Sequence, residues 1–160
     1  MGGVTINYFK EKQHNYHRTI RLVVQMPSTE KGAKKMGLDQ NLFRRTANGE
    51  QSEIYWRKAN FVHRYFTHDW EERGFAGDDC VEFPTDEAEL RMLSAMCQTV
   101  LEDKAQAEFI LPTMSGFFFG STDYDEWYFE YVKYTKDEID KLLEERPLQD
   151  GEEFFYHAWY

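Results

Sequence analysis

The sequence predicts an α+β fold: a small, mainly antiparallel sheet (two N-terminal strands plus a C-terminal strand) packed with about four helices. Apolar and polar residues alternate near both ends of the chain, as they do in half-buried strands. The middle of the chain instead carries apolar residues at helical spacing. A length of 160 residues fits one domain, 1–160, and an aromatic content of 17% supplies a packed core.

The first two strands are expected at 4–9 and 19–26, where the alternation is regular. A short helix is expected over 38–45, and Asn48-Gly49 is a turn signal.

A strong helix is expected over 52–70. Ser52 is a residue type that favours the N-cap, and Glu53 would lie in the first turn, where the helix dipole favours a carboxylate. Aromatic residues recur at helical spacing from Trp56 to Trp70, which predicts one buried stripe.

The next elements are a short strand over 80–83 and a helix over 85–103 with Thr85 as its N-cap. The helix places leucines, Cys97 and a valine on one face, so Cys97 is expected in the core. A shorter helix is expected over 104–111.

The most unusual segment holds three phenylalanines between Gly116 and Gly120. We expect the glycines to adopt special backbone angles and the phenylalanines to enter the core. Ser121 or Thr122 would cap the following helix, which ends before a proline. Residues 153–160 alternate and predict a final strand that completes the sheet with the N-terminal pair.

Charge is divided unevenly along the chain. Residues 1–70 hold 12 Lys/Arg and 6 Asp/Glu, a net charge of +6, whereas residues 71–160 hold 7 and 23, a net charge of −16. Such asymmetry is typical of proteins that bind charged partners. The plainer interpretation is that the two halves neutralise each other on one folded domain.

No motif indicates an activity. The chain lacks G-x-S-x-G, P-loop and G-x-G-x-x-G patterns, and Cys80 and Cys97 match no zinc-finger spacing. We therefore expect a protein that is not an enzyme, with no cofactor and no metal. An unrecognised enzyme or metal-binding protein stays as an alternative, with its site near His63, His68 and 116–125.

Localisation is expected to be the cytoplasm. No apolar run approaches the roughly 18 residues of a membrane span, and the first residues lack the apolar stretch of a signal peptide. Two free cysteines fit a reducing compartment.

A second alternative is nucleic-acid binding by the basic first half. Aromatic residues that can stack on bases are interleaved with its cations, although the acidic remainder would repel phosphate. The candidate cations are Lys34, Lys35, Arg44, Arg45, Arg57, Lys58 and Arg64.

The leading hypothesis is that acidic surfaces bind a basic partner, because carboxylates along a surface can imitate phosphates and steer association. The alternative for such residues is a solvated face that only keeps the protein soluble. The candidate carboxylates are Glu71, Glu72, Asp78, Asp79, Glu82, Asp86 and Glu87, followed by Asp123, Asp125, Glu126 and Glu130.

Three segments are distinctive: IYWRKANFVHRYF (54–66), LPTMSGFFFGSTDYDEWYFE (111–130) and FYHAWY (155–160). They resemble a family of small phage- and prophage-encoded proteins. The resemblance implies a virus-related protein that acts inside a bacterium, and it brings no catalytic residues. Small acidic phage proteins often inhibit host machinery or defence nucleases, which is an analogy independent of fold. We therefore expect an accessory protein that binds and modulates or inhibits a host or defence protein, such as a nucleic-acid-guided nuclease. The partner's identity and the oligomeric state stay open.

Overall fold

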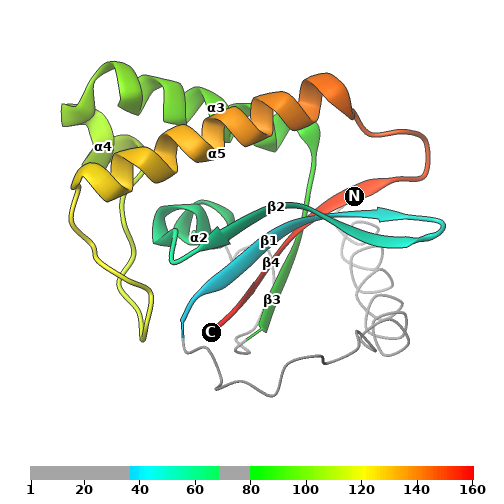
Figure 1. The fold of residues 1–160 in the computed structure, drawn as a ribbon, viewed down its shortest axis with the longest axis horizontal. Helices are drawn as coiled ribbons and strands as arrows, with labels where there is room; N and C mark the ends of the chain where they lie inside the picture. Colours follow the sequence, from blue (N-terminus) through cyan, green and yellow to red (C-terminus); the bar gives the residue numbers. More distant parts are fainter. Residues whose placement is uncertain (1–36, 69–79) are drawn as a thin grey trace, which may run out of the picture. The chain divides into compact units, whose positions relative to one another are not determined.

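The computed structural model describes residues 37–68 and 80–160, all within one compact unit, Lys35–Tyr160. It confirms the α+β class (Figure 1). The strands predicted at 4–9 and 19–26 lie outside the described residues, and a single domain over 1–160 stays a prediction. The elements are β1 (Asp39–Thr46), β2 (Gly49–Arg57), α2 (Asn60–Thr67), β3 (Cys80–Thr85), α3 (Glu87–Glu102), a 3-10 turn (Lys104–Gln106), α4 (Ala107–Ile110), α5 (Glu126–Glu145) and β4 (Glu153–Trp159).

The four described strands form one antiparallel sheet in the order β2-β1-β4-β3. The final strand is confirmed, and it lies inside the sheet, between β1 and β3. Among the described strands, β2 and β3 are therefore the outer ones, and β2 has one edge without a strand neighbour. This edge runs past α5 and contributes to the site described below.

The helix predicted over 38–45 is wrong, because these residues form β1 (Figure 1). Strand β1 pairs along both edges and has Asp39, Gln40, Asn41 and Leu42 all buried. A strand buried on both faces loses the polar–apolar alternation that identifies a strand in a sequence. The turn at Asn48-Gly49 is confirmed, since it joins β1 to β2 in a hairpin.

The helix predicted over 52–70 is wrong in its first part, and Ser52 is not its cap. Residues up to Arg57 form β2, in which Ile54 and Trp56 are buried while Tyr55 between them is exposed. This two-residue period is that of a strand. Helix α2 begins only at Asn60, and its hydrophobic face carries the second half of the aromatic stripe.

Helices α3 and α5 run antiparallel and pack side by side over one face of the sheet (Figure 1). Cys97 is buried on the predicted face of α3. Both N-caps lie later in the chain than predicted. Asp86, and not Thr85, caps α3, since its side chain accepts from Glu89 N at 2.8 Å. Asp125, and not Ser121 or Thr122, caps α5, since its side chain accepts from Tyr128 N at 3.0 Å. A carboxylate at the N-cap also meets the positive end of the helix dipole.

Candidate functional site

Two strained residues meet where the turn between β2 and α2 touches the segment 116–120, here called the Gly–Phe loop. Among described residues other than glycine, only Lys58 (φ +56°) and Phe118 (φ +64°) have a left-handed backbone. They lie against the same residue, since a Cβ on Gly37 would approach Lys58 Cε to 3.1 Å and Phe118 O to 3.8 Å. Each such conformation costs about 1–3 kcal/mol, and strain of this kind gathers at functional sites.

Asn60 holds the Gly–Phe loop in place. Its buried amide donates to Phe119 O at 3.3 Å and to Ser121 O at 2.8 Å, and its Oδ1 accepts from Met114 N at 3.2 Å. A buried side chain whose hydrogen bonds are satisfied fixes the backbone that it contacts. The loop is therefore anchored at both ends by the first residue of α2.

The three phenylalanines do not share one environment, so the prediction that they enter the core is wrong for two of them. Phe119 is buried edge-to-face against His63, with ring centroids 5.2 Å apart. Phe117 is 81% exposed and Phe118 is 40% exposed. A Cβ on Gly116 would lie 2.5 Å from the Phe119 ring, which explains the glycine by close approach.

Beside the loop, two adjoining hollows of about 270 and 350 Å³ lie along the first half of α5. The first is formed by the turn after β2 and the start of α5, and the second by the end of β2 and α5. Tyr131 lines both. Trp127, Tyr131 and Tyr134 follow one face of α5, and Tyr55 lies opposite them on β2. We call these two hollows together the α5 groove.

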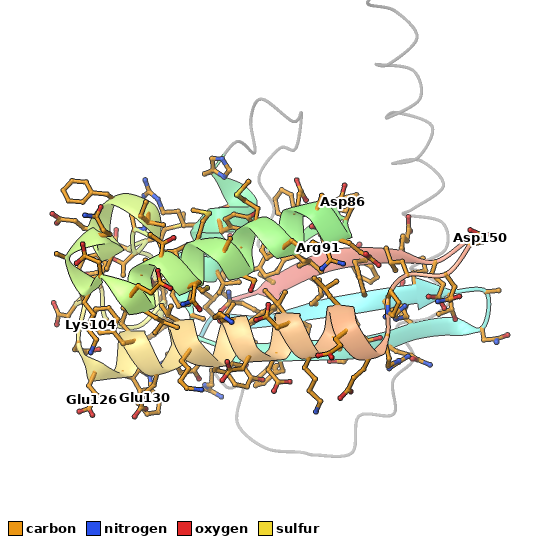
Figure 2. All side chains as sticks on the ribbon, turned by 90° about the horizontal axis from the view of Figure 1, so that it is seen from above. Asp86, Arg91, Lys104, Glu126, Glu130 and Asp150 are labelled. Carbon is orange, nitrogen blue, oxygen red and sulfur yellow. The ribbon has the colours of Figure 1, made fainter. Side chains whose placement is uncertain are left out.

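Four predicted carboxylates lie at the N-terminal end of α5. Asp123 and Asp125 line the first hollow and Glu130 lines the second. Glu126 is the first residue of the helix, at the same end as Glu130 (Figure 2). No ion pair among the described residues includes any of them. The nearest lysines of α5 pair further along the helix, with Asp137 and Asp140. Lys104 lies at the same end of the molecule, but its ammonium sits over the Phe129 ring at 4.6 Å.

The other acidic candidates lie elsewhere. Asp86 caps α3 at the opposite end of the helical layer from Glu130 (Figure 2). Glu87 accepts from Leu148 N at 2.7 Å, and Glu82 lies 3.9 Å from His157 Nδ1. Glu71, Glu72, Asp78 and Asp79 are outside the described residues. The two acidic clusters of the sequence therefore do not form one surface in the described structure.

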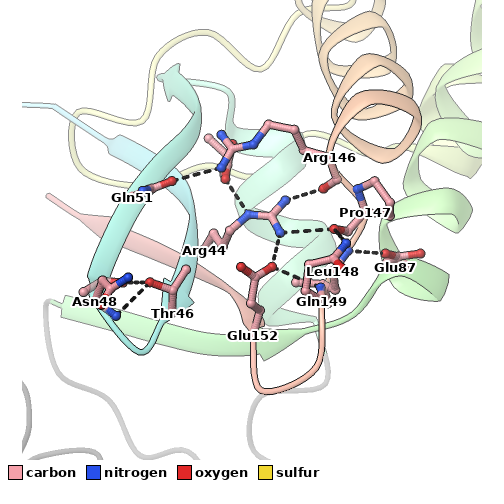
Figure 3. Close-up of polar contacts among 12 residues, drawn as sticks. Arg44, Thr46, Asn48, Gln51, Glu87, Arg146, Pro147, Leu148, Gln149 and Glu152 are labelled. Atoms are coloured by element: carbon pink, nitrogen blue, oxygen red, sulfur yellow. Dashed lines mark hydrogen bonds and ion pairs between the residues drawn. The ribbon is translucent and has the colours of Figure 1, made fainter.

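The basic candidates separate in the same way. Arg44 is buried, with ion pairs to Glu53 at 2.7 Å and Glu152 at 2.5 Å, and it also donates to the carbonyls of Arg146 and Pro147 (Figure 3). These bonds join the β1–β2 hairpin to the end of α5. They engage all three nitrogens of the Arg44 guanidinium, so Arg44 is not available to bind a phosphate.

Arg45 pairs with Glu50 at 2.6 Å and Glu153 at 2.8 Å, and it stacks on the Phe155 ring. Arg57 and Lys58 line the α5 groove. Arg64 lines a separate, largely apolar hollow of about 470 Å³ between α2, α3 and α4. Lys34 and Lys35 are outside the described residues. The structure thus does not join the basic candidates into one surface.

His63 belongs to a buried polar network. Its Nδ1 lies 2.9 Å from Tyr156 Oη, which accepts from Gln40 Nε2 at 2.9 Å. Burial lowers the pKa of His63 to about 4, so the ring is neutral at pH 7. His68 instead contacts Tyr65 O through Nδ1. In the described parts of the chain, no group of three or more His, Cys, Asp or Glu side chains is placed to hold a metal ion.

Sequence reasoning identified the carboxylates at this site but missed the aromatic rings beside them. Trp127, Tyr131 and Tyr134 recur at i, i+4 and i+7, next to the core stripe of α5, and this second stripe is the signal that could have shown them. None of the described helices is long and apolar enough to span a bilayer. Comparisons with family models, curated proteins and solved structures found no match.

Proposed function

We propose that this chain is a non-enzymatic accessory protein whose α5 groove binds a basic segment of another protein. One observation carries the proposal: Asp123, Asp125, Glu126 and Glu130 lack ion-pair partners among the described residues and lie beside exposed aromatic rings. Residues 86–146 support it, since they hold 15 acidic and 6 basic residues, a net charge of −9.

The two kinds of side chain would contribute differently. Unpaired carboxylates steer a basic partner toward the groove and raise the association rate at low salt. Exposed tryptophan and tyrosine rings bury large areas at little entropic cost, and they dominate the affinity of many interfaces. Trp127, at 66% exposed, is the natural centre of such an interface.

The resemblance to phage proteins supports a bacterial host or defence protein as the partner, such as a nuclease whose basic groove otherwise holds nucleic acid. Occupying that groove would inhibit the nuclease. Direct nucleic-acid binding receives less support, because Arg44 and Arg45 are engaged in ion pairs. Of the described cations, only Arg57 and Lys58 line the groove, and carboxylates line the same two hollows.

The experiment compares two charge reversals on the same helix. Glu126→Lys/Glu130→Lys changes the groove, and Glu144→Lys/Glu145→Lys makes the same change at the far end of α5. Partners are captured from bacterial host lysate and identified, and the purified partner is then titrated by calorimetry. We expect the first variant to lose at least tenfold in affinity while the second changes little. Equal affinities for the two variants would contradict the proposal.

A further inference from the structure

We infer that the hollow between Tyr55, Tyr131, Tyr134 and Glu130, here called the tyrosine box, binds the guanidinium of an arginine side chain of the partner. The inference rests on the proposed function and deepens it, because it assigns a ligand group to one part of the α5 groove. The hollow has a volume of about 350 Å³ and opens at the edge of β2. A site of this size takes one extended side chain and its neighbours.

The three rings are held before any ligand arrives. Tyr134 Oη donates to the Tyr55 carbonyl at 3.1 Å, and the Tyr55 hydroxyl donates to Asp39. Tyr131 packs edge-on to Tyr134 and against Trp127, with ring centroids 6.2 and 5.6 Å apart. Rings that are fixed in the free protein lose little entropy on binding, which favours affinity.

The charges select a cation. Arg57 also lines the hollow, and its register partner across β1 and β2 is Asp39, so the two side chains lie on the same face of the sheet. No ion pair among the described residues includes Glu130. The negative faces of aromatic rings add to the attraction for a cation.

Arginine fits this combination better than lysine. A guanidinium is planar, stacks on aromatic faces and offers paired donors to a carboxylate, whereas an ammonium is a compact and strongly hydrated charge. Glu130 and Tyr134 are one turn apart on α5, and Tyr131 lies next to Glu130. A guanidinium stacked on the tyrosine rings can therefore also reach Glu130.

The test uses an acetylated, amidated hexapeptide of alternating glycine and arginine, followed by NMR and calorimetry on the full chain. The matched peptides replace arginine by lysine or by citrulline, its neutral isostere, and a six-nucleotide oligothymidine probes base stacking. We expect the arginine peptide to bind several times more tightly than the lysine peptide, and the citrulline peptide and oligothymidine not to bind.

Variants then locate the site. Glu130→Gln and Tyr131→Leu should each weaken the arginine peptide at least fivefold, while the controls Glu144→Gln and Phe109→Leu should not. Tyr131→Leu removes the ring but keeps a smaller apolar side chain against the core, and the exposed Glu130 can change without loss of the fold. Equal binding of citrulline or lysine, binding of oligothymidine, no binding of the arginine peptide, or unchanged affinity in both variants would overturn the inference. The proposed function is judged separately, by the partner's response to Glu126→Lys/Glu130→Lys.

Discussion

The two ends of α5 use charge in opposite ways. At its C-terminal end, Arg44 is enclosed by Glu53, Glu152 and main-chain carbonyls (Figure 3). At its N-terminal end, carboxylates such as Glu130 lie in solvent without ion-pair partners among the described residues. Buried charges must be paired because desolvation is costly, whereas exposed charges can stay free for a partner. The first end therefore serves the fold, and the second is available for binding.

The largest effect on stability is expected from removing the buried cation. Arg44→Met leaves the nearly buried carboxylate of Glu53 without its main partner, and we expect a loss of about 3–5 kcal/mol in unfolding free energy. Urea denaturation measures it. The double change Arg44→Met/Glu53→Met removes both charges and should recover much of the loss. Near-normal stability of the single variant would show that the pair is not needed.

The buried His63 makes stability depend on pH. Its pKa is about 4 in the folded protein against 6.5 when unfolded, so lowering the pH protonates the unfolded chain first. Stability is therefore full above pH 6.5 and falls by roughly 3 kcal/mol as the pH drops toward 4. His157 has a similarly lowered pKa, also through burial, and adds to the decline. Urea midpoints between pH 7 and 4 measure the trend.

Two substitutions test which histidines cause the loss of stability at low pH. His63→Gln should flatten part of the pH profile while lowering stability at pH 7. His157→Gln should flatten another part of the profile, because burial also lowers the pKa of His157 to about 4. An identical slope in wild type and His63→Gln would mean that His63 is not the titrating group.

Removing the hydrogen bonds by which Asn60 holds the Gly–Phe loop should lower the unfolding free energy by a smaller amount. Asn60→Ala deletes three hydrogen bonds and leaves the buried Phe119 carbonyl unpaired, for a loss of about 2 kcal/mol. Hydrogen exchange should show faster opening of Phe119 and Ser121 before the sheet opens. Asn48→Ala, in the exposed hairpin turn, is the control and should change neither quantity.

The smallest stability effect is expected where exposure is greatest. Phe117→Ser should change unfolding free energy by no more than about 0.5 kcal/mol, since the ring is 81% exposed. The same change should weaken binding to a partner that covers the loop. Thermal melting and titration of the captured partner give both values. A large fall in the unfolding free energy would show that Phe117 stabilises the fold, as Arg44 does at the other end of α5.

The sequence was informative where one face of an element is buried. The apolar spacing of α3 and α5 predicted both helices, and the alternation of 153–160 predicted β4. It failed for β1, where burial on both faces hides the alternation, and for β2, where Trp56 also fits the helical spacing of α2. Local patterns cannot separate these cases, because tertiary contacts decide them.

For the candidate site, the sequence predicted which acidic residues are candidates, but it did not predict how they are arranged in space. Asp86 and Glu130 are separated because α3 and α5 run antiparallel, which depends on how the chain turns between them. The exposure of Phe117 was not predicted either, because we expected an apolar residue between two glycines to be buried in the core. Asn60 lies 57 positions earlier in the chain and bonds residues on both sides of Phe117, namely Met114 N, Phe119 O and Ser121 O.

The place of β4 has a consequence for synthesis of the protein. Strands β1 and β2 form a local hairpin that can pair as soon as it is made, but β3 has no described neighbour except β4. The ribosome must therefore reach Glu153–Trp159 before the sheet can close, and contacts between segments so distant in sequence form slowly. In a chain cut short before β4, no complete sheet would cover the apolar faces of the helices. Such a chain would be degraded by proteases and would not act as a partial binding protein.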